Sequence, residues 1–251
     1  MTTDESPVLA KPLIIAYRDE HLIAVNKPEG LLVHKSNIDK NEVRYLLQML
    51  RDQVGEYVYP VHRLDKPSSG LILFGFSAGV AADIQLQMHS NMATKAYLLI
   101  CRGYTAASGI INHPLKPLND FKSKTLPIKN IKPDLEAISE FARLDTIELD
   151  VAIDKYPSSR YSLVKVKILT GRRHQIRRHM KHLSHPIIGC PKYGKSIHNR
   201  YFATTFDVPR LLLHSYQMTL EHPVSKQPLL ITAEPLGGFK SLMERFGWQL
   251  P

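Results

Sequence analysis

The sequence is poor in cysteine and contains no long apolar run. Its two cysteines, Cys101 and Cys190, are too few for a disulfide framework and lack the Cys-x-x-Cys spacing of many metal and redox sites. No stretch of about 18 apolar residues is present, and no basic start followed by an apolar segment opens the chain. We therefore expect free thiols, a cytoplasmic location and no membrane partner.

Acidic residues are also scarce relative to basic ones. Against 33 Lys and Arg there are 23 Asp and Glu, giving a formal net charge of +10 and a pI near 9.5. This excess favours a polyanionic partner, because cationic side chains neutralise phosphates; the alternative is a generally basic surface. The 43% apolar and 22% charged residues are ordinary for a folded globular protein and exclude the disordered class.

Strand and helix patterns follow one another irregularly, which predicts an α+β fold. Short apolar segments between turn residues predict strands, and longer segments with helical periodicity predict helices. The predicted strands span residues 13–17, 22–26, 71–76, 96–102, 137–144, 161–169, 211–220 and 229–233, and the predicted helices span 43–55, 78–90, 173–183 and 239–246.

Two segments lack this patterning. Residues 1–11 are expected to form a disordered tail. Residues 112–134 combine four prolines with several lysines and few large apolar side chains, which predicts a long basic surface loop. Such a loop could serve as a linker, as a contact to the anionic partner, or as both.

One carboxylate stands among cations just before an apolar segment. Asp65 lies between Arg63 and Lys66 and precedes the predicted strand at 71–76. Neighbouring positive charges favour the ionised carboxylate, which is a poor proton donor but a competent nucleophile or base. The residues alone leave a structural alternative, because Asp-Lys-Pro-Ser-Ser-Gly is also a good turn that Asp65 could cap.

The predicted helix at 173–183 carries a high density of positive charge. Ile176 and Met180 share one apolar stripe at helical spacing. Like charges four residues apart destabilise an isolated helix by about 0.2–0.5 kcal/mol per pair, so the pattern favours phosphates and a carboxylate against it. A solvated face is the alternative for Arg173 and Lys181. The histidines here do not predict a metal site, because no acid or thiolate accompanies them and the arginines would repel a divalent cation.

Four blocks of sequence stand out, in the order Val25-Asn26-Lys27-Pro28, His62-Arg63-Leu64-Asp65, Thr94-Lys95-Ala96-Tyr97 and Gly171-Arg172-Arg173-His174-Gln175-Ile176-Arg177. Together these blocks resemble the RluA-type family of RNA pseudouridine synthases. This resemblance implies a central mixed, mainly antiparallel β-sheet flanked by helices, with the active-site cleft across the sheet. It further implies an enzyme with an RNA partner, no cofactor and no metal. One catalytic domain is expected over residues 12–251, without an N-terminal accessory RNA-binding module.

The resemblance also implies roles for single residues. Asp65 corresponds to the family's essential aspartate, and Arg177 to the arginine that pairs with it. Tyr97 corresponds to the tyrosine expected to stack on the target base or to act as a base. Arg63 corresponds to the arginine that fills the gap left by the flipped-out uridine. The other residues expected to contact RNA are His62, Lys66, Arg172, Arg173, Arg178 and Lys181.

One position departs from the family pattern, and further segments indicate a substrate. Cys190 follows His-Pro-Ile-Ile-Gly where the family usually has Asp, which puts the contacts of that acid in doubt. Residues 156–161 and 246–248 resemble family members that act on transfer RNA, which implies uridine-65 as the target. A ribosomal RNA enzyme of the same family and a non-catalytic RNA-binding protein are the alternatives. Without heptads or interface patterning, a monomer is expected. Whether Asp65 attacks the ribose, adds to uracil or removes a ribose proton stays open.

Overall fold

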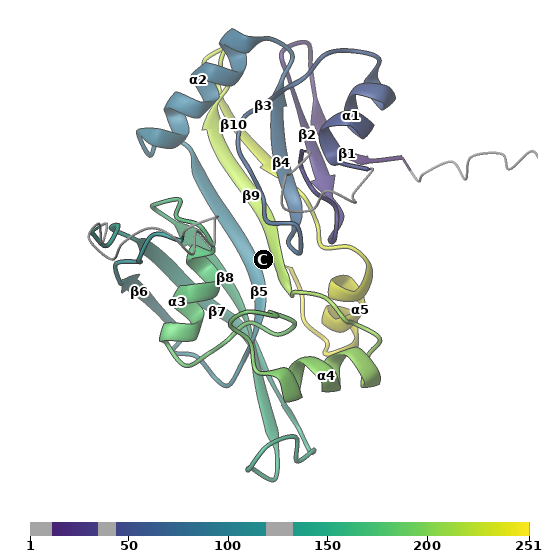
Figure 1. Ribbon diagram of the computed structural model, residues 1–251, viewed down its shortest axis with the longest axis vertical. Helices are drawn as coiled ribbons and strands as arrows, with labels where there is room; N and C mark the ends of the chain where they lie inside the picture. The colour runs from purple at the N-terminus through teal and green to yellow at the C-terminus, as the bar shows by residue number, and fades with distance from the viewer. Residues whose placement is uncertain (1–11, 35–43, 119–132, 251) are drawn as a thin grey trace, which may run out of the picture.

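The computed structural model describes residues 12–34, 44–118 and 133–250. Within these ranges ten strands form one mixed, mainly antiparallel sheet that is flanked by five helices (Figure 1). This arrangement confirms the predicted α+β class. The strands are ordered β1-β2-β4-β9-β5-β8-β7-β6, with β3 beside β4 and β10 beside β9.

The strands are β1 (Ile14–Arg18), β2 (Leu22–Lys27), β3 (Tyr59–Pro60), β4 (Ser69–Gly75), β5 (Thr94–Arg102), β6 (Ser108–Asn112), β7 (Ile138–Leu149), β8 (Ser159–Ile168), β9 (Leu213–Glu221) and β10 (Pro228–Thr232). The helices are α1 (Leu46–Val54), α2 (Ala78–His89), α3 (Gln175–His182), α4 (Ser196–Thr205) and α5 (Gly237–Arg245).

The first half of the sheet, with β1 to β4, has a helix on each face. Strands β2 and β4 are buried along their whole length, and alternate side chains point to opposite faces. Ile72 packs with Leu50 of α1 on one face. Leu71 packs with Ile84 of α2 on the other face. These apolar contacts hold the strand that follows the Asp65 segment.

The second half, with β5 to β8, is covered in the same way. Tyr97 and Leu99 of β5 pack on the face that Met180 of α3 covers. Leu98 of β5 packs on the opposite face, together with Phe202 of α4 and other residues of that core. In Figure 1, α4 and α5 lie together beside the lower part of the sheet, and the β7–β8 hairpin extends beyond them.

The two halves meet where β4 runs parallel to β9, a junction that we call the seam. It consists of Ser69 opposite His214 and Gly70 opposite Ser215. Gly70 has φ +103, and a Cβ there would lie 2.2 Å from the carbonyl oxygen of Ser215, so the close approach requires glycine. On its other side β9 pairs with β5, where Tyr97 lies opposite Ser215. Strand β9 thus connects the two halves directly.

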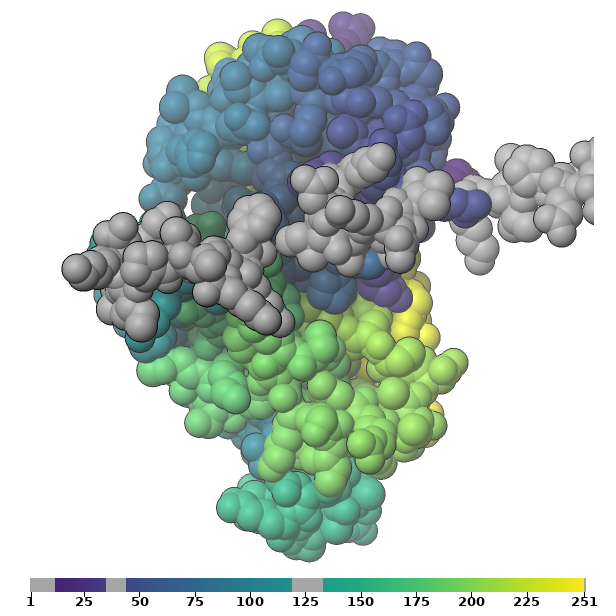
Figure 2. Space-filling view, viewed as in Figure 1, coloured from purple at the N-terminus to yellow at the C-terminus, as the bar shows by residue number. Residues whose placement is uncertain are grey.

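Figure 2 shows the same division on the surface. Residues up to about 100, in blue, form the upper part of this face, and residues from about 150 onward, in green and yellow, form most of the lower part. Segments far apart in the sequence therefore meet across the middle of the molecule. None of the helices in the described ranges is long and apolar enough to cross a membrane.

Helix α4 and strands β3 and β6 were not predicted from the sequence, and strand β7 is longer than predicted. Helix α4 has only His198 and Phe202 as its buried residues, so no apolar stripe marks it in the sequence. Strands β3 and β6 are short, and β7 continues to Leu149 instead of ending at residue 144. The predicted tail at 1–11, the first residue of the helix predicted at 43–55 and most of the basic loop lie outside the described residues.

Candidate active site

Asp65 lies in the loop between β3 and β4, where the two halves of the sheet meet. The carbonyl of Asp65 accepts a hydrogen bond of 3.0 Å from the Ser68 backbone, so the segment is also the turn that its sequence indicates. The preceding Leu64 packs against apolar clusters of both halves. The carboxylate is 22% exposed and thus remains open to solvent.

Arg177 of α3 contacts this carboxylate. Its Nη1 donates to Oδ2 of Asp65 at 2.8 Å, and the arginine side chain is only 4% exposed. A charge-assisted bond of this kind orients the carboxylate and favours its ionised form. The cation in contact therefore comes from a segment 112 residues away, whereas the sequence neighbour Arg63 is exposed at the surface.

Cys190 provides a second acceptor for Arg177. The guanidinium Nε donates to Sγ of Cys190 at 3.4 Å, and the backbone N–H of Tyr193 donates to the same sulfur at 3.4 Å. Burial disfavours a charged guanidinium, but the contacts with Cys190 and Asp65 outweigh burial and raise the pKa of Arg177. Where the family usually has Asp, this chain thus has a buried thiol against the arginine.

His174 approaches the same carboxylate oxygen. Its Nε2 lies 3.6 Å from Oδ2 of Asp65, and its Nδ1 lies 3.1 Å from the hydroxyl of Tyr193. The residue has φ 56, a left-handed conformation that is uncommon outside glycine and clusters at functional sites. Burial lowers the pKa of His174 to about 4, although the charge of Asp65 opposes the shift. The ring is therefore neutral at pH 7.

Tyr97 lies nearby on β5 and is mostly buried. Burial raises the pKa of its hydroxyl to about 12, and the negative charge of Asp65 adds to the shift. The phenol is therefore protonated at neutral pH. Of the two roles expected from the sequence, this favours stacking on the base over proton abstraction.

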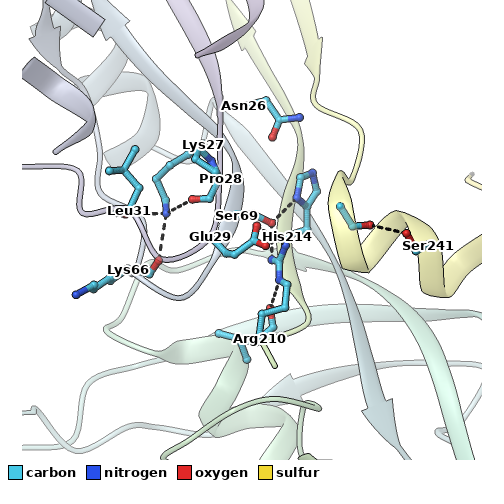
Figure 3. Close-up of polar contacts among 12 residues, drawn as sticks. Asn26, Lys27, Pro28, Glu29, Leu31, Lys66, Ser69, Arg210, His214 and Ser241 are labelled. Atoms are coloured by element: carbon cyan, nitrogen blue, oxygen red, sulfur yellow. Dashed lines mark hydrogen bonds and ion pairs between the residues drawn. The ribbon is translucent and has the colours of Figure 1, made fainter. Parts of the chain in front are cut away.

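The Asn-Lys-Pro block holds the loop that follows Asp65 (Figure 3). Lys27 is completely buried, and its Nζ donates to the carbonyls of Pro28 at 2.8 Å, Leu31 at 2.9 Å and Lys66 at 3.2 Å. Burial lowers the pKa of Lys27 to about 7, while the three carbonyls favour the ammonium form that binds them. Lys27 therefore fixes the backbone next to the carboxylate and does not reach into solvent.

Two arginines that were expected to contact RNA donate hydrogen bonds to the backbone at the two ends of the basic segment. Arg178 Nη1 donates to the carbonyl of Lys116 at 2.9 Å, and Arg172 Nε donates to the carbonyl of Glu136 at 2.8 Å. Lys116 lies within the predicted loop segment at 112–134, and Glu136 lies just after it. On α3 itself, Lys181 is exposed. Direct RNA contacts by these side chains stay a prediction.

His62 is engaged with the backbone on both ring nitrogens. Its Nε2 accepts from the Leu73 N–H at 3.2 Å, and its Nδ1 lies 3.4 Å from the Arg63 carbonyl. Burial lowers the pKa of His62 to about 3, in keeping with a neutral ring that accepts a hydrogen bond. An RNA contact by this residue also stays a prediction.

Sequence reasoning did not find Tyr193, which supports both His174 and the Cys190 contact. The sequence around Tyr193 gives little indication of a site residue, because Pro-Lys-Tyr-Gly is typical of an ordinary turn. Tyr193 also contacts Arg177 directly. The guanidinium carbon of Arg177 lies 5.4 Å from the centre of the Tyr193 ring, within reach of a cation–π contact. The site is thus assembled from a loop, a strand, a helix and a turn.

Comparison with known proteins gives consistent matches. The family model of the RNA pseudouridylate synthases matches residues 21–182. The tRNA pseudouridine synthase C of Pasteurella multocida is 43% identical over 238 residues, which cover 95% of this chain and 98% of that protein. The protein of the same name from Vibrio cholerae is 40% identical over 237 residues, covering 94% and 97%.

Solved structures share the fold. Human RNA pseudouridylate synthase domain containing 4 superposes with a TM-score of 0.69 at 22% identity, covering 95% of this chain and 94% of that one. Human RNA pseudouridylate synthase domain containing 1 gives a TM-score of 0.67 at 21% identity, covering 94% of each chain. The same sheet and its flanking helices therefore occur in other pseudouridylate synthase domains.

Proposed function

The chain belongs to the RNA pseudouridylate synthase family and is an RNA pseudouridine synthase, and from this premise we propose that it converts uridine-65 of transfer RNA to pseudouridine. The relatives named tRNA pseudouridine synthase C, 40–43% identical over nearly the whole chain, support transfer RNA as the substrate. The observation that carries the catalytic part is the ion pair of Asp65 with the buried Arg177, at 2.8 Å.

The reaction is an isomerisation, so its atoms balance within one nucleotide. The bond from uracil N1 to ribose C1′ breaks, the base turns, and C5 forms the new bond to C1′. The C5 proton leaves and N1 gains a proton. One ionised carboxylate can act as the nucleophile or base that such a sequence needs, and no external reactant is consumed.

The contacts of Asp65 support a division of roles between its two oxygens. Arg177 and His174 both approach Oδ2 and thus hold this oxygen in place. We assign Oδ1 to the reaction, with Oδ2 as the oxygen that is held. This assignment is compatible with all three possible roles of Asp65, which are attack on the ribose, addition to uracil and removal of a ribose proton.

The neighbouring residues complete the proposed site. Tyr97, protonated and partly apolar, would stack on the flipped uracil. Arg63 is exposed and would fill the gap that the uridine leaves in the RNA stem. The basic segment at 112–134 would contact stem phosphates, together with the cations at the start and along the length of α3, which are Arg172, Arg173, Arg178 and Lys181. His62 and Lys66 would contact the RNA next to Asp65, in a cleft across the sheet. We further propose that residues 12–251 act as one catalytic domain, in a cytoplasmic monomer.

Mapping of pseudouridine tests the proposal. The purified protein is incubated separately with unmodified transfer RNA transcripts and with ribosomal RNA, and carbodiimide-dependent stops of primer extension locate pseudouridine. We expect a stop at uridine-65 of transfer RNA. A transcript with cytidine at that position is the matched RNA control.

Asp65→Asn is the protein control, because it keeps the shape of the side chain and removes the charge. We expect no product and unchanged RNA affinity. A stop only in ribosomal RNA would contradict transfer RNA as the substrate. Full activity of Asp65→Asn would contradict the proposed catalytic role of the aspartate. Product from neither RNA would point to a protein that binds RNA without modifying it.

A further inference from the structure

A continuous chain of hydrogen bonds crosses the seam at Ser69, the first residue of β4 (Figure 3). Arg210 Nη1 donates to Oε2 of Glu29 at 2.7 Å, and its Nη2 donates to Oγ of Ser69 at 2.7 Å. The Ser69 hydroxyl lies 2.8 Å from Nδ1 of His214, whose Nε2 lies 2.7 Å from the carbonyl of Ala233. The chain thus links four segments of the sequence, around Glu29, Ser69, residues 210–214 and Ala233.

The partners fix the direction of every bond. A carbonyl only accepts, so His214 carries its proton on Nε2 and accepts at Nδ1. The Ser69 hydroxyl must then donate to Nδ1, and its oxygen accepts from the guanidinium of Arg210. Ser69, Arg210 and His214 are 4%, 8% and 0% exposed, so water does not compete for these groups. Each of these three side chains therefore depends on its neighbour in the chain for a hydrogen-bond partner.

The seam is a short joint between long ladders. Strand β5 pairs with β8 from Lys95 to Arg102, whereas β4 pairs with β9 only around Ser69 and Gly70. Few backbone bonds therefore fix the angle and separation of the two halves. Side-chain contacts across the seam add to these few backbone bonds, through the apolar packing of Leu71 with Met218 and through the buried hydrogen bonds of Ser69.

The seam also sets the geometry of the site. Ser69 begins the strand just after the Asp65 loop, and Ser215 of β9 lies opposite both Gly70 and Tyr97. A shift between β4 and β9 would therefore change the separation of Asp65 and Tyr97. It would also move Asp65 relative to α3, which packs on the second half.

We propose that Ser69, Arg210 and His214 are positioning residues, which lock the seam and thereby hold Asp65 at the correct distance from Tyr97. The proposal rests on the proposed role of Asp65. The side-chain hydrogen bonds described above join these residues to one another, to Glu29 and to the carbonyl of Ala233, and not to Asp65. Loss of the Ser69 hydroxyl leaves a buried guanidinium and a buried imidazole nitrogen without their partner, so the seam relaxes to recover hydrogen bonds.

Ser162 offers a matched control for a merely structural effect. This serine is completely buried on β8, and its hydroxyl donates to the Gly103 carbonyl at 2.8 Å and accepts from the Thr105 N–H at 3.2 Å. Ser162→Ala removes two hydrogen bonds of a buried hydroxyl, as Ser69→Ala does, but far from the seam. Ser69→Thr keeps the hydroxyl and is the conservative variant.

The test measures kcat and KM of these variants on the RNA that the wild type modifies. A misplacement of about 1 Å can cost about a hundredfold in rate, so we expect Ser69→Ala to lower kcat at least tenfold with little change in KM. Ser69→Thr should restore most of kcat, and Ser162→Ala should leave it near the wild-type value. Arg210→Lys should resemble Ser69→Ala, because an ammonium lacks the rigid planar fork by which two separate guanidinium nitrogens reach Glu29 and Ser69 at the same time.

Native-state amide hydrogen exchange gives a readout that needs no RNA. Ser69→Ala should speed exchange at residues 68–72 and 212–216 more than elsewhere, and Ser162→Ala should not. Equal loss of kcat in Ser69→Ala and Ser162→Ala, or exchange at the seam unchanged by Ser69→Ala, would overturn the proposal. If the wild type modifies no RNA, the proposed function fails, and local exchange still decides whether the chain locks the seam.

Discussion

The guanidinium of Arg177 is held from two sides, by the carboxylate of Asp65 and by the thiol of Cys190. The second contact places Cys190 in the support of the site, although a thiol is a weaker acceptor than the acid that the family usually has there. Tyr193 bonds to the same sulfur. The orientation of the arginine thus depends on a residue that does not touch the carboxylate.

We expect Cys190→Val to lower both activity and stability. Valine is close to cysteine in size but leaves the buried Nε of Arg177 without an acceptor, which costs about 1–3 kcal/mol. Cys190→Ser keeps an acceptor and should retain most of kcat. Urea unfolding and single-turnover kinetics measure the two effects, and equal activity of the Val and Ser variants would contradict this role.

The role of Tyr97 can be tested through its hydroxyl. Because its pKa is raised to about 12, the phenol is a poor base at neutral pH. Tyr97→Phe should keep kcat within about tenfold, whereas Tyr97→Leu should lose more, since stacking of a base on an aromatic ring is worth about 1–3 kcal/mol. Single-turnover rates on the same transcript measure both variants. A Phe variant as inactive as the Leu variant would indicate that the hydroxyl takes part in proton transfer.

At the scale of elements, the parallel contact of β4 with β9 is the feature that organises the molecule. Helices α1 and α2 cover the first half of the sheet and α3 and α4 the second, while one apolar cluster crosses the junction, with Leu71 of β4 and Met218 of β9. Asp65 belongs to the loop before β4, whereas Arg177 and Tyr97 belong to the second half. The site therefore exists only when the two halves are joined correctly.

Gly70→Ala should destabilise the protein through this contact. The left-handed φ of Gly70 costs a non-glycine residue about 1–2 kcal/mol, and the added Cβ would lie 2.2 Å from the backbone of Ser215. We expect the free energy of unfolding to fall by about 3 kcal/mol or more from strain and steric overlap together. Urea unfolding measures the change.

Gly79→Ala in α2 is the matched substitution. A Cβ there meets only the Ser77 hydroxyl, at 4.0 Å, and alanine in a helix is favoured over glycine by about 0.5–1 kcal/mol. This variant should be as stable as the wild type or slightly more stable. If Gly70→Ala behaved in the same way, the close approach at the seam would not limit stability.

At the scale of the whole molecule, buried neutral histidines predict sensitivity to acid. Burial lowers the pKa of His198 and of His214 to about 4, below the ordinary value of about 6.5. Nδ1 of His214 accepts from Ser69, and Nε2 of His198 accepts from Arg102 at 3.2 Å. Protonation of either ring would remove the acceptor that its partner uses.

The sign of the effect follows from these pKa values. Between pH 6.5 and about 4 the unfolded chain binds more protons than the folded one, so stability falls as the pH falls. Each histidine contributes about 1.4 kcal/mol per pH unit in this range, and its contribution is complete above pH 6.5. Urea unfolding at pH 7.5, 6.0 and 5.0 measures the slope, and His198→Gln should reduce it. Equal stability at pH 5.0 and 7.5 would contradict the prediction.

The sequence by itself determined the family, most of the strands and helices, and the candidate residues Asp65, Tyr97 and Arg177. These features are local: a strand shows its apolar run, and each motif lies within a few consecutive residues. Helix α4 was not predicted because its buried face carries a single large apolar side chain. The basic helix and its inward stripe were predicted because their spacing is regular.

Only the tertiary structure decided which groups meet. The pairing of Asp65 Oδ2 with Arg177, the approach of His174, the thiol of Cys190 behind the arginine and the chain through Arg210 join segments that are up to nearly two hundred residues apart. No local pattern encodes such contacts, because they arise from the order of strands in the sheet. The seam between β4 and β9 brings them together, and it depends on a close backbone approach that no spacing in the sequence reveals.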